Sequence, residues 1–227
     1  GLSRASAEVK DKPNVILIVV DTLRFDHLGF AGYPRPVSPN LDRFAADSLI
    51  CSNARTAASW TSPSIGAMFT SRYPASLEIQ NMKQLRLDQR FVTMAELLKN
   101  SFYRTYAIVS HRFVDSEMGF AQGFDFMDEE NCQGHSHISS KSITDKAQSF
   151  LKEGSQTPFF LFLHYFDPHY RFRLHDKFDY YPEYRGQIPR DGDISIEAIR
   201  SKAPGNKDDL KYIKALYDSE IRYTDHY

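Results

Sequence analysis

The feature that most constrains the fold is an unbroken apolar run, Val-Ile-Leu-Ile-Val-Val, at residues 15–20. Its β-branched residues favour an extended strand. Because apolar and polar residues do not alternate, we predict a strand buried on both faces within a largely parallel sheet. Asp21 follows the run directly and places a carboxylate at the carboxyl end of that strand.

Predicted strands and helices alternate along the rest of the chain. Further strands are predicted at residues 49–53, 105–109 and 158–163, and helices at 38–46, 61–70, 93–100, 142–152 and 208–227. This alternation is typical of an α/β sandwich around a mostly parallel sheet. Residues 171–206 show no clear period, so we predict a long surface excursion there.

Composition limits the class of protein. The chain has 227 residues, 41% of them hydrophobic, which is enough for one sizeable core. We expect a flexible lead-in at residues 1–13 and a single domain over 14–227. The 28 basic and 29 acidic residues leave a net charge of -1. This balance argues against nucleic acid as a partner.

Polar side chains gather where the predicted strands end. Ligands of parallel sheets bind at the carboxyl ends of the strands, which is where Asp21, His111 and residues 164–169 fall. A carboxylate such as Asp21 is costly to bury unless a cation or a hydrogen-bond donor satisfies it. Capping of a turn or helix explains Asp21 equally well.

Thr61 opens the predicted helix at 61–70, followed by Ser62, Pro63 and Ser64. A hydroxyl there lies near unpaired N–H groups and the positive end of the helix dipole, which favour a phosphate or sulfate group. An ordinary N-cap accounts for the same residues, and N-caps are commoner than nucleophiles.

Two histidine-rich segments receive different interpretations. His164, Asp167 and His169 lie within six residues at a strand end, where they could bind an oxyanion, transfer protons or ligate a metal. By contrast, His135 and His137 follow an acidic stretch. We interpret that second segment as solvated surface, since no cysteine or further histidine pair completes a zinc site.

Taken in order, these segments resemble the sulfatase family of the alkaline phosphatase superfamily, in a branch with a threonine nucleophile. The similar segments are residues 14–29, 38–42, 60–74, 119–125, 162–170 and 217–225. The resemblance implies a three-layer sandwich with helices flanking a mostly parallel central sheet. It also implies that this chain is the N-terminal portion of such a domain, incomplete at its C-terminal end.

The resemblance assigns roles to individual positions. Asp21 and Thr61 become ligands of one divalent metal ion, which could be calcium, magnesium, manganese or zinc. Thr61 also becomes the nucleophile, and His169 a second catalytic residue in contact with the substrate. Substrate-binding roles are predicted for His111, His164 and Ser64. The implied partner is a sulfate or phosphate ester. Extracytoplasmic location is expected, with membrane or cell-envelope association through segments outside this chain.

Departures from the family pattern leave three functions open. Thr61 replaces the usual Cys or Ser and Ile65 the usual Arg, so we expect no formylglycine. Thr22 replaces a second Asp, and Val109 replaces a Lys. The chain could therefore be a metal-dependent hydrolase, a transferase of the phosphoethanolamine or phosphoglycerol type, or a non-catalytic domain that binds an anion or glycan.

The pair Asp225-His226 imitates a metal-binding Asp-His pair of the family. We predict instead that it belongs to the last helix, because it continues the pattern that begins near Asp208. The corresponding Asp-His segment is then expected beyond this chain.

Overall fold

The computed structural model describes residues 12–79, 86–135, 137–154, 157–190, 194–202 and 206–227. These residues form two compact units. The sheet unit contains the described residues up to 19 together with 53–134 and 142–165, and the α8 unit contains 20–52, 135–141 and 166–227.

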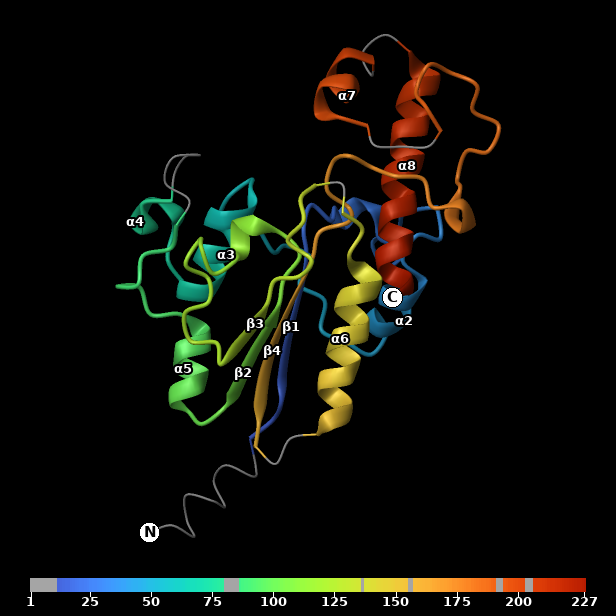
Figure 1. The fold of residues 1–227 in the computed structure, drawn as a ribbon. Coiled ribbons are helices and arrows are strands. Elements are labelled where there is room, and N and C mark those ends of the chain that lie inside the picture. Colours follow the sequence, from blue (N-terminus) through green and yellow to red (C-terminus); the bar gives the residue numbers. More distant parts are fainter. Residues whose placement is uncertain (1–11, 80–85, 136, 155–156, 191–193, 203–205) are drawn as a thin grey trace, which may run out of the picture. The chain divides into compact units, whose positions relative to one another are not determined.

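The sheet unit is built on four parallel strands, β1 (Val15–Val20), β2 (Arg104–Ile108), β3 (Phe126–Asp128) and β4 (Phe159–Tyr165). Their spatial order is β1-β4-β2-β3, so β4 and β2 lie in the middle (Figure 1). Ala107 pairs with Phe162 of β4 and with Met127 of β3. The predicted parallel α/β sheet is confirmed.

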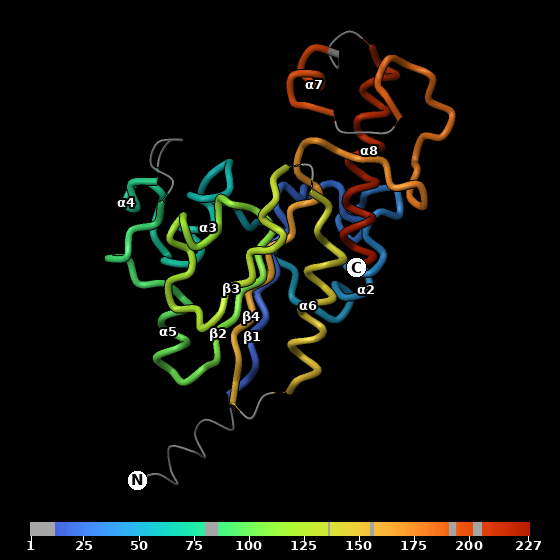
Figure 2. The backbone as a smooth tube through the Cα atoms, viewed as in Figure 1, coloured from blue at the N-terminus to red at the C-terminus, as the bar shows by residue number. Residues whose placement is uncertain are grey.

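Helices cover both faces of this sheet, as the backbone trace shows (Figure 2). On one side lie α3 (Thr61–Thr70), α4 (Pro74–Leu77) and α5 (Met94–Asn100), and on the other lies α6 (Ser140–Glu153). Neighbouring residues of β4 point to opposite faces. The Phe162 ring therefore meets Phe69 of α3 at 4.9 Å between centroids, whereas Phe159 meets Phe150 of α6 at 5.3 Å. This is the predicted three-layer sandwich.

Burial differs between the edge strand and the central strand. All seven residues of β4 are buried, as expected for a strand covered on both faces. The same prediction for β1 is wrong, because Ile16 is 46% exposed and Ile18 57%. The alternate residues Val15, Leu17 and Val19 pack against the core. As an edge strand, β1 has one covered face in the described residues.

The α8 unit is organised by its last helix, α8 (Lys207–His226). Its short helices are α2 (Pro39–Ala45), α7 (Ile196–Lys202) and the 3-10 helices η1 (Phe25–His27), η2 (Gly29–Ala31) and η4 (Asp176–Phe178). The prediction of a surface excursion at 171–206 is wrong in one respect. Tyr184, Ile188 and Ile194 are at most 4% exposed and pack on Tyr212 and Leu216 of α8. A segment whose apolar residues show no helix or strand periodicity can still form a core when those residues pack against one helix.

Other local predictions had mixed outcomes. The predicted strand at 49–53 is wrong: these residues have no regular structure, and Leu49 is 92% exposed. The predicted helix at 93–100 is confirmed as α5, which Thr93 caps by accepting a hydrogen bond from the Glu96 N–H at 3.2 Å. The sequence analysis missed β3 and α4, which have only three and four residues. Among the described residues, no helix has the length and apolar character needed to cross a bilayer.

Candidate functional site

Thr61 is the first residue of α3, after Trp60 in an extended N-cap position. The N-cap interpretation of Thr61 is therefore wrong by one residue. Thr61 is only 6% exposed, and its neighbour Ser62 is fully buried. The Ser62 hydroxyl donates to the carbonyl oxygen of Phe113 at 2.8 Å. This bond ties the amino end of α3 to the loop that follows β2.

His111 begins that loop, which continues into η3 (Arg112–Val114). Its imidazole is fully buried, and Nδ1 accepts a hydrogen bond from the Phe113 N–H at 3.3 Å. Phe113 thus contacts His111 through its amide and Ser62 through its carbonyl. The structure therefore gathers the predicted nucleophile and one predicted substrate-binding histidine around a single loop.

His164 lies within β4 rather than beyond its end. It is fully buried, and its carbonyl accepts a hydrogen bond from the Ser110 hydroxyl at 2.6 Å. The same hydroxyl lies 3.4 Å from His164 Nδ1. These contacts join the carboxyl ends of β2 and β4, so His164 helps to hold the two strand ends together.

Ser64 and Ile65 occupy the first turn of α3 after the predicted nucleophile. The Ser64 hydroxyl lies 2.7 Å from that of Thr56, so it has a local partner. Ile65 is 3% exposed and belongs to the apolar core. The position that carries arginine in the resemblance therefore faces packed side chains.

In the α8 unit, the loop after β1 is held by hydrogen bonds of Thr22. Thr22 has a left-handed φ of 55°, and its hydroxyl donates to the Pro168 carbonyl at 2.9 Å. The Thr22 carbonyl accepts from the Tyr217 hydroxyl at 2.7 Å. Asp21, half-buried, precedes this residue. The structure thus joins the Asp21 loop to the turn that carries His169.

His169 lies in a cluster of rings. Its imidazole stacks on Phe166 with centroids 4.3 Å apart and planes at 16°, and Tyr170 lies 4.4 Å away. Asp167 has a separate task, because its carboxylate accepts hydrogen bonds from the Ser139 and Ser140 N–H groups at 2.8 and 2.9 Å. Asp167 therefore caps α6, and contact between His169 and a substrate stays a prediction.

His135 joins the same ring cluster, which the sequence analysis did not predict. It is half-buried, and its ring lies 5.1 Å from that of His169 and 4.8 Å from that of Tyr170. Burial lowers the pKa of His135, Arg171 lowers it further, and the Asp21 carboxylate acts in the opposite direction. The interpretation of His135 as solvated surface is wrong. The spacing of the histidines along the sequence could not predict this contact, because His135 and His169 lie in segments far apart in the chain.

Buried charges on α8 were also missed. Asp218 is fully buried and accepts hydrogen bonds at 2.7 Å from Tyr33 and Arg35, and His27 Nδ1 lies 2.7 Å from it. Asp225 accepts from the backbone N–H of Leu41 at 2.8 Å. The prediction that Asp225-His226 belongs to the last helix is confirmed, because α8 runs to His226, and Asp225 binds the start of α2.

The donor chemistry at Asp21 and Thr61 suits a divalent cation, because carboxylate and hydroxyl oxygens are hard ligands. Within the described ranges, however, no group of three or more His, Cys, Asp or Glu side chains is arranged to hold a metal. Thr61 belongs to the sheet unit and Asp21 to the α8 unit. Their joint ligation of one cation stays a prediction.

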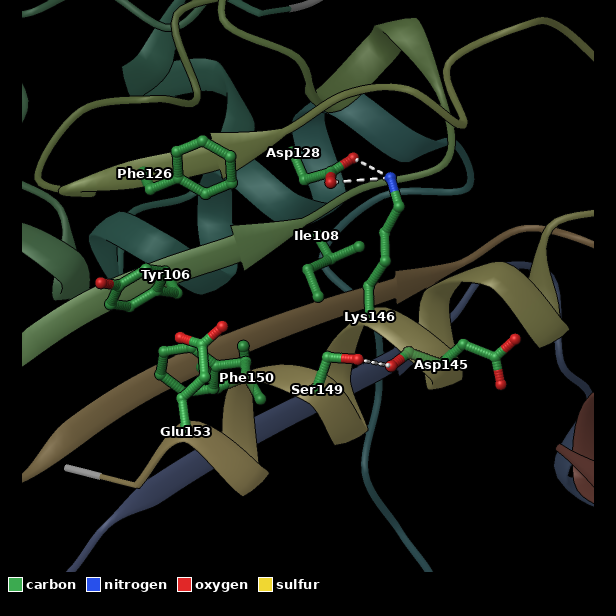
Figure 3. A pocket seen from close by; sticks show the side chains of 10 residues that line it. Tyr106, Ile108, Phe126, Asp128, Asp145, Lys146, Ser149, Phe150 and Glu153 are labelled. Carbon is green, nitrogen blue, oxygen red and sulfur yellow. Dashed lines mark hydrogen bonds and ion pairs between the residues drawn. The ribbon is translucent and has the colours of Figure 1, made fainter.

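A cavity of about 350 Å³ lies elsewhere in the sheet unit, between α6 and strands β2 and β3 (Figure 3). Its walls are mainly apolar, with Tyr106, Phe126 and Phe150 among them. Lys146 reaches from α6 to the Asp128 carboxylate at 2.6 Å. None of the predicted site residues lines this cavity, so it is separate from the strand-end histidines.

Comparison with known proteins supports the resemblance. A family model described as Sulfatase matches residues 13–227. Bovine (Bos taurus) arylsulfatase A is 37% identical over 112 residues, which cover 46% of this chain and 21% of that protein. The N-acetylgalactosamine-6-O-sulfatase of Bacteroides thetaiotaomicron is 29% identical over 108 residues, covering 46% and 21%. The matched segment is thus about a fifth of each curated relative.

Solved structures share the fold. The C-terminal periplasmic domain of EcEptC from Escherichia coli superposes with a TM-score of 0.68 at 17% identity, covering 96% of this chain and 58% of that one. The phosphonate monoester hydrolase of Agrobacterium radiobacter gives a TM-score of 0.71 at 17% identity, covering 95% and 57%. This chain therefore spans little more than half of these neighbours. Since the family model extends over nearly all of its residues, the chain belongs to the sulfatase family.

Proposed function

We propose that this chain carries the nucleophile of an enzyme that hydrolyses sulfate or phosphate esters, with Thr61 as the attacking residue. The observation that supports this most is the position of Thr61. It is the first residue of α3, it is nearly buried, and Ser62 and Phe113 tie it to the His111 loop. Backbone N–H groups at a helix start favour an anionic group, so an ester there would meet the hydroxyl.

The proposed reaction has two steps. In the first, Thr61 Oγ bonds to the sulfur or phosphorus atom, the bond to the ester oxygen breaks, and the hydroxyl proton passes to a water molecule. The leaving alcohol takes a proton, for which His169 is the candidate donor. In the second, water attacks the Thr61 ester, releases sulfate or phosphate and restores the hydroxyl.

We propose Asp21 and Thr61 as ligands of a divalent cation. When bound, such an ion lowers the pKa of a hydroxyl and offsets charge on the non-bridging oxygens. Asp21→Asn should lower the metal content of the full-length protein after dialysis against Mn²⁺ or Ca²⁺, measured by elemental analysis. Unchanged stoichiometry would remove Asp21 from the ligand set.

The nucleophile is tested with Thr61→Ala, Thr61→Ser and Thr70→Ala. Thr70 is the matched control, because it ends the same helix and its hydroxyl donates to the Gly66 carbonyl. We expect Thr61→Ala to abolish turnover of an aryl sulfate or a bis-aryl phosphate, while Thr61→Ser and Thr70→Ala keep it. Turnover by Thr61→Ala at the parent rate would exclude Thr61 as nucleophile.

Two other functions can be separated from hydrolysis. Adding an acceptor alcohol distinguishes a transferase, because the transferred group then appears on the acceptor rather than as free sulfate or phosphate. A binding domain without catalysis is favoured by one observation: Ile65, at the position that carries arginine in the resemblance, is 3% exposed and belongs to the apolar core. Absence of bound metal and of turnover in the full-length protein, with retained affinity for inorganic sulfate, would support that function.

Substrate and location follow from the relatives only as proposals. One structural neighbour is described in complex with D-glucosamine-2-N,6-O-disulfate, and EcEptC contributes a periplasmic domain. We propose a sulfated sugar as the first substrate to test and an extracytoplasmic location, including association with the cell envelope. Fractionation of the native host should find the protein outside the cytoplasm, and a purely cytoplasmic signal would overturn this location.

A further inference from the structure

We propose that His135 is a positioning residue that holds the imidazole of His169 in place for catalysis. This inference rests on the proposed function, in which His169 contacts the substrate. It assigns a role to the histidine-rich segment around residue 135, which the resemblance left without one.

Rings surround His169 from two parts of the chain. Phe166 stacks on it with centroids 4.3 Å apart, and Tyr170 lies 4.4 Å away, both from the same turn. His135 comes from a distant segment, with its centroid 5.1 Å from His169 and its plane tilted by 55°. Of these three rings, only that of His135 comes from outside the turn that carries His169.

His135 also contacts the two rings that hold His169. Its centroid lies 4.8 Å from Tyr170 at 31° and 5.5 Å from Phe166 at 70°. Both centroid distances lie within the range of roughly 4.5–7 Å at which aromatic rings attract one another. The His135 ring therefore restrains His169 directly and through both of its neighbours.

The backbone that carries His135 is anchored to the same turn. The Ser139 hydroxyl and N–H both donate to one Asp167 oxygen at 2.9 and 2.8 Å, and the Ser140 N–H donates to the other at 2.9 Å. Asp167 lies two residues before His169. Charge-assisted bonds of this kind are strong, so the two segments are held in one arrangement.

Small displacements of a catalytic group are costly, because a shift of about 1 Å can lower the rate about 100-fold. We therefore expect His135→Ala to lower kcat about 10- to 100-fold with little change in KM. His135→Phe keeps an aromatic ring of similar size and should restore most of kcat. His137→Ala is the matched control from the same segment and should behave like the parent.

The variants are made in the full-length protein and assayed with the ester that the parent turns over. Loss of kcat in His135→Ala with rescue by His135→Phe supports positioning by ring packing. Parent-like kcat in His135→Ala overturns the proposal. So does a His135→Phe variant as impaired as His135→Ala, because the nitrogen atoms rather than the ring would then matter.

A second readout does not depend on turnover. The NMR signal of the His169 Cε1–H group should shift in His135→Ala and stay unchanged in His137→Ala, because the neighbouring ring affects its shielding. An unmoved signal in His135→Ala overturns the proposal even if the proposed function holds. If the parent shows no turnover, the proposed function fails, and this signal then reports only whether the His135 ring packs on His169.

Discussion

The two units of the chain differ in what accompanies their buried rings. In the sheet unit, Phe69 of α3 contacts Phe120, Phe124 and Phe162 at centroid distances of 4.9 to 6.2 Å. The α8 unit also buries rings, with Tyr184 stacked on Tyr212, but its last helix adds the buried carboxylates of Asp218 and Glu220, which are at most 2% exposed. Regular strands satisfy their own backbone groups, so their core can be apolar. Irregular loops cannot, and α8 supplies acceptors for them.

Each buried carboxylate of α8 holds a different loop. Asp218 binds Tyr33 and Arg35 near the start of the chain. Glu220 accepts from the Arg173 N–H at 2.6 Å and lies 2.8 Å from His175 Nε2. Buried polar networks stabilise only when every member is paired. From this comparison, we expect the replacement of a polar side chain to cost less stability in the sheet unit than in the α8 unit.

The largest expected effect comes from the ring core of the sheet unit. Phe69→Ala should lower the free energy of unfolding by about 4 to 5 kcal/mol, because it removes a buried ring and leaves a cavity. Urea denaturation measures this change. Leu97→Ala on α5 is the control, since Leu97 is 59% exposed, and it should cost less than about 1 kcal/mol. Equal costs for both variants would refute the ring core.

The buried network of α8 should respond almost as strongly. Asp218→Ala leaves the His27, Tyr33 and Arg35 donors without their acceptor and should cost about 4 kcal/mol. Asp218→Asn keeps the shape and one acceptor oxygen, so it should cost less. Denaturation of both variants tests the order. A neutral Asp218→Ala would mean that these bonds do not stabilise the α8 unit.

The next largest effect is a pH dependence of stability that arises in the α8 unit. Burial raises the pKa of Glu220 to about 7 from an ordinary 4.5, and nearby Asp167 raises it too, while His175 lowers it. Since the folded pKa is the higher one, this stabilisation is complete below about pH 4.5 and is lost as pH rises through about 7. The loss should reach about 3 kcal/mol.

Glu220→Gln should remove this loss of stability with rising pH, because the amide does not titrate. It can still accept a hydrogen bond from the Arg173 N–H and donate one to His175. Thermal denaturation between pH 5 and pH 8 measures it on the full-length protein. Glu78→Gln is the control, since that carboxyl lies on the surface of the sheet unit with 68% of its side chain exposed. If Glu220→Gln follows the parent curve, Glu220 does not change protonation in this range.

The smallest expected effect concerns a helix cap in the sheet unit. Thr93→Ala removes the hydroxyl that accepts from the Glu96 N–H in the capping box of α5. It should cost about 1 kcal/mol in urea denaturation. A cost above that of Asp218→Ala would reverse the comparison, because a local polar bond would then matter more in the sheet unit than the buried network in the α8 unit.

Part of the fold and site could be predicted because the signals are local. The apolar runs of β1 and β4, the start of α3 at Thr61 and the helix α5 are each set by neighbouring residues. Segments too short to show a period, such as β3, were missed for the same reason.

The amino-acid sequence by itself determined the long strands and helices, the placement of polar residues at the strand ends and the membership of the sulfatase family. Periodicity, capping and strand ends depend on residues a few positions apart, so they can be read along the chain. Only the tertiary structure decided that Ile18 is exposed, that His135 meets His169 and that Asp218 is buried with three partners. These features depend on which distant segments pack together, and burial and charge pairing arise from that packing.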